Sequence, residues 1–94
     1  MATAQDATAS TEAAIIARVI HPERADMSND AAQAVLRLFS LDQADLDRMH
    51  DLAVKNQDDA LTPAEKVELE NYIRVSYFVD LMHAKARLSL QKHN

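Results

Sequence analysis

Two carboxylate–histidine pairs are the residues of this chain whose spacing could support metal chemistry. Asp47 and His50, like Asp80 and His83, are three positions apart, so each pair would share one helix face. Two such pairs form half of a four-helix di-iron site, which also needs two inward-facing glutamates from other helices. The first two predicted helices carry acids mostly at their ends, so we predict no bound metal. Asp80, His83 and Arg87 instead indicate a solvated ion-pair network.

The absence of two residue types excludes several other kinds of active site. The chain has no glycine, which disfavours phosphate-binding loops, dinucleotide-binding loops and the nucleophile elbow of hydrolases. It also has no cysteine, which excludes disulfides, thiolate zinc sites and cysteine catalysis. We therefore predict a protein that is not an enzyme and binds no cofactor.

The charge of the chain is unevenly distributed. The formal net charge is −5, which argues against a general nucleic-acid binder. Residues 42–62 contain six acids and two bases. A helix-turn-helix over 28–56 would turn four of these acids, those at positions 42, 45, 47 and 51, toward phosphates. We interpret the six acids as a plain solvated surface or as a site for a basic protein partner. The candidate residues of this acidic surface are Asp42, Asp45, Asp47, Asp51, Asp58 and Asp59.

The C-terminal end supports an alternative function. Residues 81–94 carry three bases, two histidines and no acid. Cations are common at helix C-termini because they interact favourably with the helix dipole. The alternative is a small DNA-associated regulator that uses Arg74, Lys85, Arg87 and Lys92.

Composition and periodicity indicate an all-α fold with four helices, three short and one long. Alanine and leucine are abundant, and both favour helix. We expect residues 1–10 to be a disordered tail and residues 11–94 to form one helical domain. Pro22 should end a first helix that begins near Thr11 and runs to Ile20.

The next two helices are predicted from capping residues and apolar periodicity. Ser28 can cap a helix whose apolar face ends at Phe39. Ser40 and Gln43 have the spacing of a capping box, which would start a third helix that fades near Asn56.

The last predicted helix spans residues 63–92 and has the clearest start signal. In Thr62-Pro63-Ala64-Glu65, threonine caps, proline occupies the first helical position and glutamate completes a capping box. About 30 residues make a helix of about 45 Å. A compact domain of this size is only about 30 Å across, so the helix should extend beyond its own domain.

The long helix carries two opposed apolar stripes separated by polar seams. A helix that is apolar on two sides is normally buried between two layers. The three short helices could supply one layer and a second copy of the chain the other, so we predict a helix-bundle dimer. The alternative is a monomer whose short helices wrap both faces. One stripe consists of Ile73, Tyr77, Leu81, Ala84 and Leu88, and the other of Val75, Val79, Met82 and Ala86, flanked by Phe78 and Leu90. The seams consist of Ser76, Asp80, His83 and Arg87 on one side, and Arg74, Lys85 and Ser89 on the other.

No segment of the sequence predicts insertion into a membrane or export. No run approaches the roughly 18 apolar residues of a membrane span. The N-terminus lacks the basic start and apolar core of a signal peptide. We therefore expect a cytoplasmic protein.

Residues 61–92, LTPAEKVELENYIRVSYFVDLMHAKARLSLQK, resemble the C-terminal half of a family of small all-helical bacterial proteins of uncharacterised function. Ala17-Arg18-Val19-Ile20 and the segment from Met27-Ser28 to Phe39 resemble its first half. Genes of this family often lie next to genes for HNH-type nucleases. The resemblance implies an acidic partner of a nuclease, such as an antitoxin or immunity-like protein, and it assigns no site residues.

Together these patterns predict a non-enzymatic helical module for protein–protein interaction. It would self-associate through the apolar stripes of the long helix and bind a basic protein, such as a nuclease, with the acidic surface.

Overall fold

A computed structural model describes residues 11–93, and within this range the chain is all-helical with four helices and no strands. They are α2 (Glu12–Ile20), α3 (Asn29–Leu38), α4 (Gln43–Gln57) and α5 (Pro63–His93). The predicted all-α class with four helices is therefore confirmed, whereas the predicted disordered tail, residues 1–10, lies outside the described residues. None of these four helices combines the length and apolar character needed to cross a lipid bilayer.

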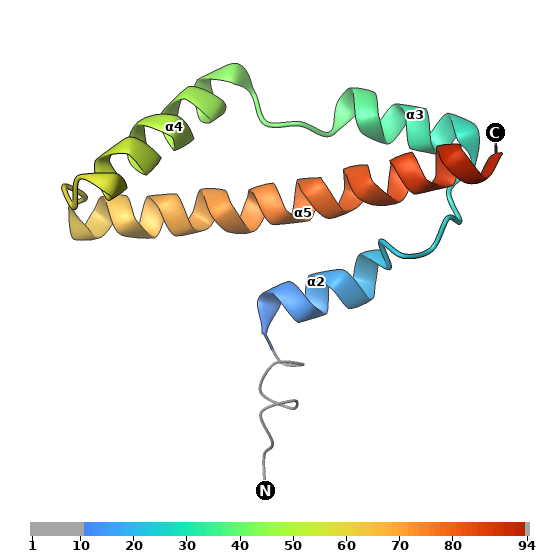
Figure 1. Ribbon diagram of the computed structural model, residues 1–94, viewed down its shortest axis with the longest axis horizontal. Helices are drawn as coiled ribbons and strands as arrows, with labels where there is room; N and C mark the ends of the chain where they lie inside the picture. Colours follow the sequence, from blue (N-terminus) through green and yellow to red (C-terminus); the bar gives the residue numbers. More distant parts are fainter. Residues whose placement is uncertain (1–10, 94) are drawn as a thin grey trace, which may run out of the picture.

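The long helix α5 organises the fold. Each of the three shorter helices packs against α5, and within residues 11–93 no two of them pack against each other. In Figure 1, α3 and α4 lie along one side of α5 and α2 lies along the opposite side. The Cα atoms span only 16 Å along the shortest axis of the molecule. The short helices are thus distributed over both sides of α5, as in the monomeric alternative, and the molecule is a single layer.

Side-chain caps begin three of the helices at the predicted residues. The hydroxyls of Thr11 and Ser28 accept hydrogen bonds at 3.1 Å from the N–H groups three positions ahead, so they cap α2 and α3. At α5, the Thr62 N–H donates to the Glu65 carboxylate at 3.0 Å and the Glu65 N–H donates to the Thr62 hydroxyl at 3.1 Å. This reciprocal capping box confirms the start of α5.

Two helices end without glycine by placing other residues in the left-handed region. His21 follows α2 with φ 54°, and Asp59 follows α4 with φ 55°. Aspartate tolerates this region better than most residues, because its short polar side chain can form local hydrogen bonds. Pro22 cannot continue a helix, so α2 ends at Ile20, as predicted.

The predicted start of the third helix was wrong. Ser40 does not cap it; α4 begins at Gln43, and Asp42 occupies the N-cap position without a side-chain capping bond. Phe39 ends α3 in an extended conformation and is exposed, although we expected it on the apolar face. The reason is geometric: the connection must cross from the C-terminal half of α5 to its N-terminal half (Figure 1).

The buried core is small and divided between contacts with α5. Against the C-terminal half of α5, Ala32 and Val35 of α3 are buried on Ala86. Against its N-terminal half, Leu52 of α4 and Leu69 of α5 are buried. The Ala32–Ala86 contact brings two helix backbones close together because neither alanine has a bulky side chain.

Two residues of the predicted polar seam of Arg74, Lys85 and Ser89 are engaged within the fold, whereas Arg74 is exposed. Ser89 is fully buried, and its hydroxyl accepts a hydrogen bond from the Met27 N–H at 3.2 Å. The Lys85 ammonium donates to the Ile20 carbonyl at 2.7 Å and lies 2.8 Å from the Asp26 carboxylate. These contacts hold the α2–α3 connection against α5. The last carbonyl groups of a helix have no partner within the helix, and Lys85 of α5 donates to one of them at the end of α2.

Candidate interaction surfaces

Charged hydrogen bonds between α4 and α5 fix these two helices as a hairpin. The Arg48 guanidinium donates two hydrogen bonds to the Glu68 carboxylate, both at 2.8 Å. The Lys55 ammonium donates to Glu65 at 2.6 Å. The bond from Lys55 and that from the Thr62 backbone lower the pKa of Glu65 to about 2, and Arg48 lowers the pKa of Glu68. Glu65 therefore serves both as a helix cap and as an ion-pair partner.

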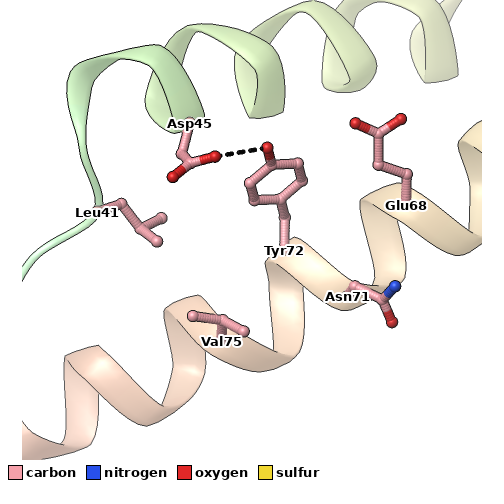
Figure 2. A pocket seen from close by; sticks show the side chains of 6 residues that line it. All are labelled: Leu41, Asp45, Glu68, Asn71, Tyr72 and Val75. Atoms are coloured by element: carbon pink, nitrogen blue, oxygen red, sulfur yellow. Dashed lines mark hydrogen bonds between the residues drawn. The ribbon is translucent and has the colours of Figure 1, made fainter.

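The aromatic side chain of Tyr72 bridges the same two helices (Figure 2). Its hydroxyl donates to the Asp45 carboxylate at 2.8 Å, which raises the pKa of the Tyr72 phenol. Asn71 points away from this hydrogen bond, on the outer surface of α5. The pocket beside the pair has a volume of about 330 Å³ and is lined by Leu41, Asp45, Glu68, Asn71, Tyr72 and Val75.

Five of the six predicted acidic-surface residues are exposed. The exception is Asp45, which is half-buried and turned toward α5 by its bond to Tyr72. Asp47 accepts a hydrogen bond from Gln43 at 2.9 Å and remains on the surface. The acidic surface is therefore defined below as Asp42, Asp47, Asp51, Asp58 and Asp59.

The basic residues proposed for DNA binding do not form one exposed patch. Lys85 is engaged with the Ile20 carbonyl and with Asp26. Arg74 lies 3.8 Å from Glu12 and donates to the Asn71 side chain at 3.0 Å. Two of the four candidate phosphate contacts are thus occupied within the chain, which weakens the DNA-binding alternative.

The first predicted apolar stripe is partly covered by α2. Ile73 and Tyr77 line a hollow of about 240 Å³ with Ala13 and Ile16 of α2, yet Ile73 remains 58% exposed. Farther along the stripe, Leu81 and Leu88 are half-buried and Ala84 is exposed.

The second predicted stripe changes character along its length. In its C-terminal half, Met82 and Leu90 pack at the edge of the Ala86 contact with α3. Val79 is half-buried in the groove beside α4. In contrast, Val75 is 48% exposed and Phe78 is 38% exposed. Because α3 covers only the C-terminal half of α5, this stripe is open in the middle of the helix.

Sequence reasoning missed two residues that extend this open region toward the N-terminus of α5. Val67 is 56% exposed, and Asn71 is also exposed. The signal was present, because Val67, Asn71, Val75 and Phe78 follow one another at intervals of four, four and three residues, which keeps them on one helix face. The open stripe is defined below as Ala64, Val67, Asn71, Val75 and Phe78, all of which are exposed.

The two carboxylate–histidine pairs do not come together. Asp47 and His50 belong to α4, where both are exposed. In the other pair, His83 forms a hydrogen bond with the carbonyl of Phe39 in the α3–α4 connection. The ion-pair network expected for Asp80, His83 and Arg87 does not form, since no salt bridge joins them in the described part of the chain. Nor does that part contain a group of three or more metal-ligating side chains arranged to hold a metal ion.

Comparison with known proteins adds no family assignment. No protein-family model matches the chain, and no curated protein or solved structure shows significant similarity to it.

Proposed function

We propose that this chain is a non-enzymatic, cytoplasmic module for protein–protein interaction, which self-associates as a dimer and binds a basic protein. The observation that carries the proposal is the exposure of large apolar side chains in the middle of α5. Val67, Val75 and Phe78 lie on one face of the helix, and each is more than a third exposed. Ile73 and Tyr77 are also more than a third exposed, but they lie on the opposite face beside α2. Contiguous exposed apolar surface on a small protein commonly marks an interaction site.

Self-association is supported by the way in which the fold leaves α5 uncovered. The helix is about 46 Å long at 1.5 Å per residue, and its partners α3 and α4 are separate, shorter helices that pack against opposite halves of it. A second copy could bury side chains that the first cannot cover, and each large apolar side chain fully buried contributes about 1.5–3 kcal/mol.

The acidic surface supports binding of a basic partner. Its five aspartates extend from the start of α4 to the turn before α5, and α4 is held rigidly by the bonds of Arg48 and Lys55. A rigid surface of one charge sign accelerates association with an oppositely charged protein. The class of partner we propose is a basic nuclease, which would make this chain an antitoxin or immunity-like protein, as the resemblance of residues 61–92 implies.

The two parts of the proposal are tested by separate measurements. Light scattering between about 1 and 500 μM should show a shift from monomer to dimer, since mass action favours the dimer at high concentration. A compact monomer at every concentration would contradict self-association.

Binding of a basic partner is tested with a purified HNH-type nuclease of net positive charge. Binding should weaken steeply with salt, because the interaction is between exposed charges. A variant in which Asp47, Asp51, Asp58 and Asp59 are replaced by asparagine should bind at least tenfold more weakly. The control replaces Glu12, Glu23 and Glu70, which are exposed acids outside this surface, by glutamine. Equal loss in both variants, or no binding by the wild-type chain at low salt, would contradict the proposal.

A further inference from the structure

The open stripe of α5 is symmetric in sequence about its central residue. Val67 and Val75 lie four positions before and after Asn71, and Ala64 and Phe78 lie seven positions before and after it. All five side chains are exposed on one face of the helix. A surface with this symmetry is complementary to itself when a second copy lies antiparallel, because a two-fold axis places the same patch on both partners.

We infer that two copies of this chain pair antiparallel through their open stripes, with the two-fold axis at Asn71. This inference rests on the proposed self-association and specifies its geometry. With the axis at position 71, a residue a given number of positions before Asn71 faces the residue the same number of positions after Asn71 in the partner. Val67 therefore faces the partner's Val75, and Ala64 faces the partner's Phe78. The small side chain of alanine leaves room for the large ring, while the two valines are matched in size.

Asn71 is the polar residue that fits the position on the axis. An amide group carries both donors and an acceptor with two lone pairs, so two facing asparagines can bond to each other. The Arg74 guanidinium already donates to the Asn71 oxygen at 3.0 Å and fixes the amide on this face. A single asparagine in an otherwise apolar helix seam is also a known means of setting register and the number of chains.

The open stripe ends where the fold begins to cover the same face. Beyond Phe78, this face continues through Met82 and Ala86, which α3 covers. In the antiparallel pair, the partner's helix starts at the partner's Pro63, opposite position 79, so it ends before it reaches Met82. The partner therefore occupies the uncovered length of α5, beside the pocket that Asn71 and Val75 line together with Asp45 of α4, while α2 lies along the opposite side of the helix (Figure 1).

Charges beside the stripe are complementary in this arrangement. Glu70 and Arg74 lie on one flank of the stripe and are 3.7 Å apart within the chain. Antiparallel pairing brings each Arg74 to within two positions of the partner's Glu70. It also brings the end of α5, where Arg87 and Lys92 are exposed, toward the other chain's turn at Asp58 and Asp59. A parallel pair would instead place like charges at the same level along the two helices.

Disulfide cross-linking tests this geometry, since the chain contains no cysteine of its own. Two cysteines form a disulfide only when their Cα atoms lie within about 7 Å. Asn71→Cys should therefore form a cross-linked dimer under mild oxidation. An equimolar mixture of the Val67→Cys and Val75→Cys variants should give a mixed dimer, whereas neither variant alone should cross-link efficiently.

The control for random collision is Val54→Cys, because Val54 is 44% exposed on α4, close to the exposure of Val75. This variant should form disulfide-linked dimers only at the slow rate set by random collision between chains. Efficient cross-linking of Val67→Cys alone would show parallel pairing and overturn the inference. If the wild-type chain dimerises but neither Asn71→Cys nor the mixture cross-links above the control, the inference fails while self-association stands. A strictly monomeric chain would overturn both.

A charge at the axis provides an independent test in the uncross-linked protein. Asn71→Asp places two carboxylates opposite each other, so we expect the dissociation constant of the dimer to rise at least about tenfold at pH 7. Lowering the pH to about 3.5 should reverse much of this effect as the carboxylates become protonated. The control Asn56→Asp adds the same charge at an exposed position of α4. Equal weakening by both variants would contradict a contact at Asn71.

Discussion

Individual charged side chains join α4 to α5, and Glu65 takes part in more than one of these contacts. Its carboxylate accepts hydrogen bonds from the Lys55 ammonium and the Thr62 N–H, and its own N–H is bonded to the Thr62 hydroxyl. Both bonds to the carboxylate are stronger when it is ionised, so the pKa of Glu65 falls from 4.5 to about 2. One residue thereby couples the start of α5 to the end of α4.

The stability of the protein should therefore depend on pH through Glu65. A carboxylate whose pKa is lowered by folding stabilises the folded state above its unfolded pKa, and this contribution is lost as the pH falls toward the folded value. We expect the Tm of the wild-type protein to decrease as the pH falls from about 5 to 2. Glu65→Gln retains a capping side chain but no charge, so its Tm should be lower at pH 7 and should decrease less.

The matched control for this pH dependence is Glu12→Gln, an exposed glutamate in the first turn of α2. Its profile of Tm against pH should follow that of the wild-type protein. Thermal unfolding followed by circular dichroism measures all three proteins. Parallel profiles for the wild type and Glu65→Gln would contradict the role assigned to Glu65.

At the scale of the elements, α5 uses different side chains for each of its contacts. It meets α3 through small residues, with Ala86 and Ala32 both fully buried. It contacts α4 through ion pairs and through the packing that buries Leu52 of α4. It holds the end of α2 through its own Lys85. Close packing against α3 therefore depends on the absence of side-chain volume at one position of α5.

Enlarging this position should separate α3 from α5. Ala86→Leu inserts three carbon atoms into a fully buried contact, and overpacking of this kind costs about 1–3 kcal/mol in the free energy of unfolding. The control Ala84→Leu makes the same change two positions earlier, where the side chain is exposed. Its effect should lie within about 0.5 kcal/mol of zero. Urea denaturation measures both, and equal effects would show that the Ala86 contact is not tightly packed.

At the scale of the whole molecule, the described chain lacks a single core shared by all its helices. The buried residues of α3 and of α4 contact opposite halves of α5, and the two short helices do not pack against each other. A substitution that destabilises one of these contacts can therefore affect the other only through α5. Local opening of one short helix is then expected without loss of the remaining structure.

Hydrogen exchange should reveal this independence. Leu52→Ala removes a fully buried side chain from the α4–α5 contact, a class of change that typically costs about 2–5 kcal/mol. Amide exchange should accelerate throughout α4 and much less in α3. Mass spectrometry of peptides from each helix measures this, and equal acceleration in both helices would indicate one cooperative unit instead.

The four helices were predictable because local signals specify most of their ends. Capping residues at Thr11, Ser28 and Thr62 act on backbone groups within three positions, so their effect is independent of the rest of the fold. The start of α4 was missed because Ser40 and Gln43 have the spacing of a cap, but the connection from α3 must stay extended there to reach α4.

The sequence predicts which residues form the apolar stripes and the acidic surface, but not which of them are exposed or which partners they contact. The apolar residues of α5 follow from helical periodicity, and five of the six predicted acidic residues are exposed. Asp45 could not be assigned from sequence, because its bond to Tyr72 joins residues 27 positions apart. Ser89 and Lys85 could be placed only in a polar seam for the same reason, since their partners lie more than 60 positions away.

The long helix shows where sequence and tertiary structure divide their roles. Its start, its length and its two apolar stripes follow from sequence alone, because capping and periodicity depend on neighbours within a few residues. Which part of each stripe stays exposed was decided only by tertiary structure. The two connections between the short helices determine where α2, α3 and α4 meet α5, and they leave the face around Asn71 uncovered. That uncovered face, rather than the stripes as a whole, is the surface proposed for assembly.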